Sequence, residues 1–307
     1  MKVEKTVIAL GFFDGVHRGH GALLRKAAER AGELNAAPAV FTFDRSPKEF
    51  VTGKPVLLIN SNDDRRDIIR RVYGIQRVIF APFDREMMTM PWQDFITELL
   101  VKQYGAVHLV AGHDYRFGHK NEGTVERLRE KCRELGLGCD IIPKVELEGI
   151  TVSSTYIRTL LEQGDVERAA LFLGHPHCLS QTVRHGQRLG RTIGIPTVNL
   201  AVPAHVLTPE RGVYITRAFL PDGRSCPGVT NVGTRPTVTE GDTVSVETYL
   251  LGFDGDLYGQ TVRLDFYKRL RGEVKFPSLE ALRQRYDERR AGVRQGSVRA
   301  AHGPCQS

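Results

Sequence analysis

Two histidines, His17 and His20, lie three residues apart in the segment LGFFDGVHRGH, residues 10–20. Histidines at this spacing can bind a metal, pack inside the protein or donate hydrogen bonds to a phosphate. A zinc site needs a third protein ligand. His113 and His119 are available, but their segment has no helical ligand spacing. Such a pair is more often structural than catalytic, so spacing alone does not decide among the three chemistries.

The position of this pair in the chain favours phosphate binding. Residues 6–10 predict a strand and residues 20–32 an amphipathic helix, so the histidines lie at a strand-to-helix turn. Ligands of open α/β sheets bind beyond the carboxyl ends of the strands, and a helix N-terminus attracts phosphate. His17 and His20 could then stabilise charge that develops at an α-phosphate. Three glycines allow a tight turn and a close approach of the ligand: Gly11, Gly15 and Gly19.

A second cluster, TVSSTYIR at residues 151–158, begins another predicted helix. Any of its hydroxyl residues could simply cap that helix. Arg158 follows Thr155 by three residues and therefore shares its helix face. Hydroxyls and a guanidinium at one helix N-terminus are also suited to binding a triphosphate. Capping and phosphate binding both stay open for Ser154 and Thr155.

The second half contains GRTIGIPTVNL at residues 190–200, where Thr197 and Asn199 point to one side of a predicted strand. Pro196 restricts the backbone before them. Paired oxygen-bearing side chains suit Mg²⁺ with phosphates, although this pattern alone is more typical of a turn or an edge-strand cap. The sequence has neither a Walker A motif nor protein-kinase motifs.

The arrangement of predicted elements divides the chain into an α/β part and a β part. Strands expected at residues 6–10, 38–43, 77–83, 106–112 and 139–145 alternate with helices expected at 20–32, 63–74, 91–105, 122–136 and 153–174. This alternation predicts a doubly wound parallel sheet. Six short β-like segments then predict a small antiparallel barrel, followed by an amphipathic helix at 278–295. We expect domains at 1–174 and 178–296.

The composition indicates a globular protein of 307 residues, with 41% hydrophobic and 26% charged residues. We expect a cytoplasmic location, because the chain lacks a long apolar segment and a convincing signal peptide. The five cysteines include no C-x-x-C pair and predict reduced thiols. Four of the seven excess positive charges lie in residues 283–299, which we interpret as a solvated helix face. Neither nucleic acid nor a membrane is an expected partner, and self-association stays open.

GFFDGVHRGH together with SSTYIR resembles the H-x-G-H nucleotidylyltransferases, in particular the FAD synthetase module of bacterial bifunctional riboflavin kinase/FAD synthetases. TFDRSP at residues 42–47 and GHDYRFGHKNEG at 112–123 are similar to further segments of that module. GVTNVGTRPTV, VETYLLGFDGDLYG and RLRGEVKF resemble riboflavin kinase segments in the same order. The resemblance covers nearly the whole chain.

The resemblance implies two reactions with small-molecule substrates. The barrel would transfer the γ-phosphate of ATP to riboflavin, with Glu247 as general base and Thr197 and Asn199 holding Mg²⁺. The first module would join FMN to ATP and release pyrophosphate, giving FAD. His17 and His20 would act in that second reaction. The nucleotide-binding residues it implies are Gly11, Phe13, Asp14, Gly15, Gly19, Asp114, Ser154, Thr155, Arg158, Gly194 and Pro196.

One departure from the family concerns Arg45-Ser46-Pro47, where the family usually has Pro-His-Pro. The missing histidine supports an alternative, a riboflavin kinase whose adenylylation module is weak or altered. A second alternative is a non-catalytic flavin- or RNA-binding regulator, which the basic C-terminal segment would suit.

Overall fold

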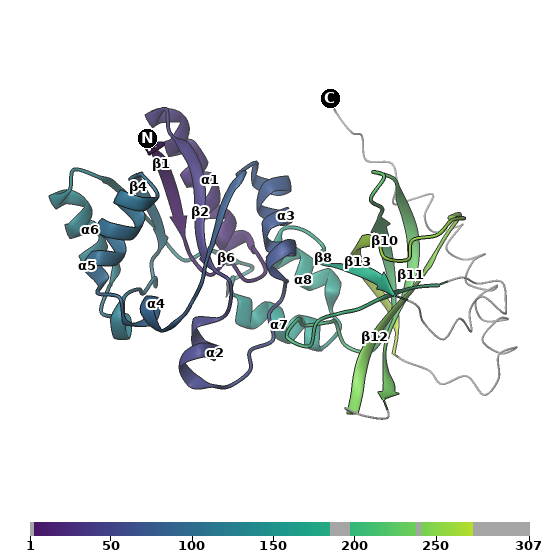
Figure 1. Cartoon of the computed structure of the whole chain (residues 1–307). Helices are drawn as coiled ribbons and strands as arrows, with labels where there is room; N and C mark the ends of the chain where they lie inside the picture. The colour runs from purple at the N-terminus through teal and green to yellow at the C-terminus, as the bar shows by residue number, and fades with distance from the viewer. Residues whose placement is uncertain (1–2, 185–196, 238–240, 273–307) are drawn as a thin grey trace, which may run out of the picture.

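Five parallel strands form the centre of the N-terminal part in the order β3-β2-β1-β4-β5 (Figure 1). The computed structural model describes residues 3–184, 197–237 and 241–272. The strands are β1 Thr6–Leu10, β2 Ala37–Phe43, β3 Arg77–Ala81, β4 Ala106–Gly112 and β5 Gly138–Ile142. The expected parallel sheet is therefore confirmed, with strand ends within a few residues of those predicted.

Alternate side chains of β1 enter two different cores, which is why helices cover both faces of the sheet. Val7 and Ala9 pack with α1 (Arg18–Leu34) and α3 (Asn62–Tyr73). Ile8 and Leu10 face the other way and pack with η1 (Phe95–Gln103) and α6 (Val125–Glu134). This alternation follows from the two-residue period of a strand and gives a three-layer arrangement.

Two predicted helices are divided in the structure. The segment expected to be helical at 91–105 forms the short α5 (Trp92–Asp94) and then η1, a π-helix. The segment at 153–174 forms α7 (Ser154–Glu162) and α8 (Val166–Leu173). Gly164 between them has φ +77°, a left-handed conformation that ends a helix, and Asp165 caps α8. Smaller elements absent from the prediction are α2 Pro47–Thr52, α4 Arg85–Thr89, η2 His119–Asn121, β6 Glu146–Leu147 and β7 Ile150–Thr151.

Six antiparallel strands close into a barrel in the order β10-β11-β12-β9-β8-β13, as expected for the second half. They are β8 His177–Arg184, β9 Thr197–Leu200, β10 Gly212–Phe219, β11 Ser225–Thr237, β12 Gly241–Leu250 and β13 Thr261–Arg271. Thr216, Thr230 and Thr248 are buried and joined in a chain of hydroxyl hydrogen bonds of 2.8 Å each. The predicted helix at 278–295 lies outside the described residues.

The barrel is attached to the N-terminal part by direct contacts as well as by α7 and α8, which lie between them in Figure 1. Residue Leu58 forms a bridge with Val206, and the backbone N–H of Ser180 donates to Asp64 at 3.0 Å. Arg263 of β13 pairs with Asp67 of α3 at 3.2 Å. These contacts fix β8 and β13 against α3.

No helix in the described part of the chain combines the length and the apolar character needed to cross a membrane. The cysteines within those ranges are free thiols, as predicted: Cys132, Cys139, Cys178 and Cys226. The domain limits at 174 and 178 stay a prediction, and β8 begins between them at His177.

Candidate functional site

The loop between β1 and α1 places both histidines of the H-x-G-H segment at the carboxyl edge of the sheet. His17 is the N-cap of α1, and its Nδ1 accepts a hydrogen bond from the His20 backbone N–H at 3.2 Å. The turn uses left-handed backbone at Phe13, Gly15 and Val16, with φ of 54°, 81° and 42°. Because Nδ1 of His17 is an acceptor, its neutral ring carries the proton on Nε2, where it can be donated.

Burial keeps both histidine rings in the neutral form. It lowers the pKa of His17 to about 4, with His175 and Arg158 adding to the effect. It also lowers the pKa of His20 well below the usual value, and the nearby His17 and Arg65 lower it further. At neutral pH both side chains are therefore uncharged hydrogen-bond donors. An anion that binds beside them raises their pKa and strengthens the hydrogen bonds that they donate.

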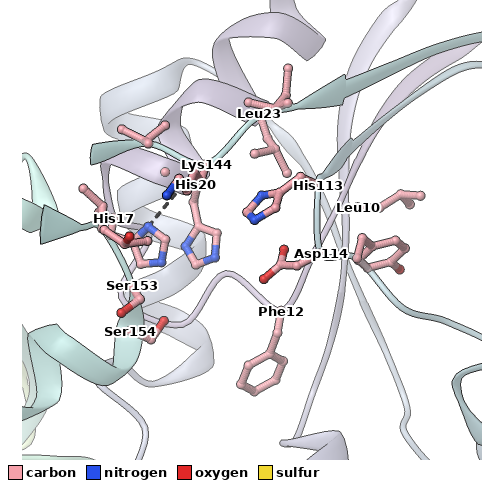
Figure 2. A pocket seen from close by; sticks show the side chains of 18 of the residues that line it. Leu10, Phe12, His17, His20, Leu23, His113, Asp114, Lys144, Ser153 and Ser154 are labelled. Carbon is pink, nitrogen blue, oxygen red and sulfur yellow. Dashed lines mark hydrogen bonds between the residues drawn. The ribbon is translucent and has the colours of Figure 1, made fainter. Parts of the chain in front are cut away.

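These histidines line the N-terminal pocket, a cavity of about 530 Å³ at the ends of β1, β4 and β5. Figure 2 shows the carboxylate of Asp114 on the side of the His20 ring that is away from His17. Ser153 and Ser154 lie beside His17. Seven predicted nucleotide-site residues are among those that line it: Gly11, His17, Gly19, His20, Asp114, Ser154 and Thr155. The structure thus brings two distant motifs to one cavity.

The N-terminus of α7 forms one wall of the pocket. Ser153 is the N-cap and accepts from the backbone N–H of Tyr156 at 3.3 Å. The hydroxyl of Ser154 donates to the backbone carbonyl of Asp14 at 2.9 Å, which ties α7 to the H-x-G-H loop. Thr155 is exposed to the pocket. Two helix N-termini, those of α1 and α7, therefore border the cavity and favour an anion.

Four predicted nucleotide-site residues are not among those that line this pocket, and their role stays a prediction: Phe13, Asp14, Gly15 and Arg158. Arg158 forms an ion pair with the buried carboxylate of Asp14 and donates to the Leu57 carbonyl at 3.0 Å. The other Asp14 oxygen accepts from the backbone of Ile59 at 2.9 Å. Burial raises the pKa of Asp14 although Arg158 and Arg65 oppose this effect. These contacts occupy the guanidinium that the prediction assigned to phosphate.

Arg45 and Ser46 do not take the place of the histidine that is usual in the family. Ser46 is buried and caps α2 by accepting from the Glu49 N–H at 3.3 Å. The Arg45 side chain is 60% exposed, lies 3.7 Å from Asp44 and does not line the pocket. Only Pro47 of this segment reaches the pocket. Arg45 therefore supplies no group in place of the absent imidazole.

Several residues that line the pocket were not assigned to the nucleotide site from the sequence. His113 and Arg116 line the pocket beside Asp114, at the carboxyl end of β4. Lys144 follows β5 and also lines it, paired with Glu146 at 2.7 Å. The position of these residues just after predicted strands was the available signal, since this is where α/β sheets bind ligands.

In the barrel, β-sheet register brings together three predicted residues that are distant in sequence. Asn199 of β9 lies directly opposite Glu247 of β12, and Thr197 lies opposite Tyr249. Directly opposite residues point to the same face of a sheet, so Thr197, Asn199 and Glu247 share one face. The residues next to Asn199 and Glu247 along the two strands, namely Leu200, Val246 and Thr248, are buried, which places this trio on the outer face of the barrel wall.

We call this group the barrel site: Thr197, Asn199 and Glu247. Glu247 is half-buried, and in register it also lies opposite Asn231 of β11, while Asn199 lies opposite Arg184 of β8. The predicted residues Gly194 and Pro196 lie outside the described residues. Within the ranges that the structure describes, no group of three or more histidine, cysteine or acidic side chains could hold a metal. A metal here would need hydroxyl, amide and phosphate oxygens instead.

Comparison with known proteins gives matches over both parts of the chain. A family model described as FAD synthetase matches residues 1–156, and one described as riboflavin kinase matches residues 173–295. A bifunctional riboflavin kinase/FMN adenylyltransferase of Pseudomonas fluorescens is 36% identical over 298 residues, covering 96% of this chain and 94% of that protein. A protein of Bacillus subtilis with the same description is 33% identical over 289 residues, covering 92% and 90%.

A solved structure has the same architecture over the full length. It is described as a macrolide-efflux protein from Streptococcus pneumoniae and matches with a TM-score of 0.82 and 29% identity. The match covers 96% of this chain and 95% of that one. The combination of parallel sheet and closed barrel is therefore shared with an experimentally determined structure.

Proposed function

The chain belongs to the bifunctional riboflavin kinase/FMN adenylyltransferase family, and from this premise we propose how its residues divide the two reactions. The barrel phosphorylates riboflavin to FMN, and the N-terminal part joins FMN to AMP from ATP to make FAD. The observation that carries the proposal is the convergence of the H-x-G-H loop and the α7 N-terminus on one pocket. The proposal includes a cytoplasmic location, where ATP and riboflavin meet.

In adenylyl transfer, a phosphate oxygen of FMN attacks the α-phosphorus of ATP, and the bond from that phosphorus to the β-phosphate oxygen breaks. Nε2–H of His17 donates to a non-bridging oxygen of the α-phosphate, where negative charge increases. The ring of His20 is stacked on that of His17 and donates a hydrogen bond next to it. The N–H groups and hydroxyls at the start of α7, with Ser154 and Thr155, hold the leaving pyrophosphate. Asp114 orients the nucleotide from the opposite wall.

In phosphoryl transfer, Glu247 accepts the proton of the riboflavin 5′-hydroxyl as its oxygen attacks the γ-phosphorus of ATP, and ADP leaves. The side-chain oxygens of Thr197 and Asn199 fit Mg²⁺, since magnesium prefers a few hard oxygen ligands and the register places Asn199 beside Glu247. When bound, Mg²⁺ neutralises charge on the ATP phosphates. Asn199 therefore links the metal site to the base.

The test is a flavin product assay with riboflavin, ATP and Mg²⁺, in which the flavins are separated by chromatography. The wild-type chain should produce FMN and then FAD. Glu247→Gln should slow FMN formation by about 10²–10⁴-fold, because it removes the base, and should still convert supplied FMN to FAD. Glu210→Gln, which changes an exposed carboxylate of the barrel, is the matched control. Absence of both products from the wild type would overturn the proposal.

The alternative of a kinase with weak adenylylation keeps one supporting observation. Ser46 stands where the family usually has histidine, and neither Ser46 nor Arg45 is among the described residues that line the pocket. FMN that accumulates without FAD in the same assay would select this alternative.

A further inference from the structure

The largest fully buried side chain of the described residues belongs to Arg65, a cation with no role in the reactions above. Arg65 lies in the first turn of α3 and bonds to residues that line the N-terminal pocket. One guanidinium nitrogen donates to the Phe12 carbonyl and to the Thr42 hydroxyl, the latter at 3.2 Å. The other donates to the Phe43 carbonyl at 3.0 Å and to the Asn62 side chain. Arg65 thus joins the ends of β1 and β2 to α3.

Two of these acceptors belong to residues of the pocket wall. Phe12 and Phe43 both line the N-terminal pocket, and the Arg65 guanidinium also lies 4.7 Å from the centre of the Phe12 ring. Phe12 precedes His17 by five residues in the same loop. The position of Phe12 therefore influences where the loop places the histidine rings.

None of the four hydrogen bonds of the Arg65 guanidinium goes to a carboxylate. Its hydrogen-bond acceptors are carbonyl, hydroxyl and amide oxygens, which are neutral. Asp14 and Asp44 attract Arg65 electrostatically, but each forms its ion pair with another cation, Asp14 with Arg158 and Asp44 with Arg45. A buried cation is costly unless it is paired. An anion in the adjacent pocket, such as a phosphate, would add a further opposite charge.

We propose that Arg65 is a positioning residue for adenylyl transfer, which fixes the Phe12 and Phe43 wall of the pocket and supplies a buried positive charge behind His20. This inference rests on the proposed function of the pocket. Arg65 does not touch the reacting atoms. It acts through the backbone of the H-x-G-H loop and through the electrostatic potential at the phosphates.

The effect of the Arg65 charge can be measured separately from the effect of its hydrogen bonds to the loop, because the charge also acts on the pKa of His20. Arg65 is one of the groups that lower the pKa of His20. The other charged or titratable groups around that ring lie on its own loop and at the ends of β4 and β5: His17, His113, Asp114 and Lys144. None of these is changed by a substitution in α3.

The experiment compares Arg65→Met, Arg65→Lys and Arg66→Met in the full chain. Arg66 is the matched control, because it is adjacent in α3 and stacks on the Phe80 ring at 4.8 Å, as Arg65 does at 5.0 Å. Arg66 pairs with Asp63 and does not reach the pocket wall. The readouts are kcat and KM for FAD formation from FMN, FMN formation from riboflavin, and the NMR titration of His20.

Arg65→Met should lower kcat for FAD formation by about 10²-fold, the effect expected when reacting groups are misplaced by about 1 Å, with a smaller change in KM for ATP. FMN formation should stay unchanged. The fluorescence of Trp92, the single tryptophan, should show that the N-terminal part is folded. The midpoint of the His20 titration should rise in Arg65→Met and stay at the wild-type value in Arg65→Lys and Arg66→Met. Arg65→Lys should also recover much of the lost rate.

Arg65→Met with wild-type FAD formation would overturn the inference. So would a His20 midpoint unchanged in Arg65→Met together with equal rate losses in the Met and Lys variants, which would indicate a purely structural brace. Wild-type protein that makes FMN but no FAD would overturn the proposed adenylylation instead, and the His20 titration would then still test the charge of Arg65.

Discussion

The imidazole rings of His17 and His20 are stacked, with centroids 3.6 Å apart and planes 12° from parallel. Two imidazolium ions at this separation would repel each other strongly, whereas two neutral rings do not. The stack therefore fits the neutral state that burial imposes on the pair, and both rings line the N-terminal pocket (Figure 2). A phosphate that binds beside the rings raises their pKa and so favours the protonated form.

The first prediction is that His17 stays neutral far below the usual histidine range in the free protein. Its pKa is lowered to about 4 by burial, so its NMR resonance should not titrate between pH 7.5 and about 5, whereas an unperturbed histidine has its midpoint near 6.5. His17→Gln identifies the signal. A midpoint near 6.5 for His17 in folded protein would contradict the buried, stacked arrangement.

The second prediction concerns the ion pair between Asp14 and Arg158. Arg158→Met should reduce the free energy of unfolding by about 3 kcal/mol, because it leaves a buried carboxylate unpaired. The double variant Asp14→Asn/Arg158→Met should be more stable than Arg158→Met, because it removes that charge. Urea unfolding followed by Trp92 fluorescence measures both. If Arg158→Met unfolds like the wild type and loses only ATP affinity, Arg158 is a phosphate ligand, as the sequence suggested.

The third prediction is that Arg45 does not take over the role of the missing histidine. Its side chain is 60% exposed and does not line the pocket, so Arg45→Ala should leave the rate of FAD formation unchanged, as surface substitutions usually do. The steady-state rate with saturating FMN and ATP checks this. A large loss of rate at unchanged FMN formation would show that Arg45 reaches the phosphates during the reaction.

The fourth prediction is a loss of stability at mildly acidic pH that depends on His177. This ring is fully buried, and neither of its nitrogens has a hydrogen-bond partner among the described residues. Burial lowers its pKa to about 3, and His175 adds to the effect. The unfolded chain binds the proton near pH 6.5, so stability from this group is present above that pH and decreases as the pH falls toward 3.

His177→Phe removes this titration while keeping an aromatic ring beside Phe266, which lies 5.7 Å from His177. Between pH 7.5 and 5 the wild type should lose about 2 kcal/mol more unfolding free energy than the variant. Urea unfolding at the two pH values provides the comparison, and the other buried histidines contribute equally to both proteins. Equal losses in the two proteins would show that the His177 ring is protonated without cost in the folded state.

The sequence by itself determined the features that depend on residues close to one another along the chain. The alternation of strands and helices predicted the parallel sheet, and short β segments with turn signals predicted the barrel. The motif residues His17, His20, Ser154 and Thr155 were identifiable because a strand-to-helix turn and a helix N-terminus are local structures, whose phosphate-binding groups follow from backbone geometry.

Only the tertiary structure decided which of the predicted residues meet. Arg158 and Asp14 are 144 positions apart, and their pairing depends on how α7 packs against the H-x-G-H loop. The pairing of Asn199 with Glu247 requires the β9–β12 register, since a one-residue shift would move each side chain to the opposite face. From the sequence, Arg65 was only one residue of a helix predicted at 63–74. Its burial results from contacts with the loop after β1 and with β2, which no local pattern records.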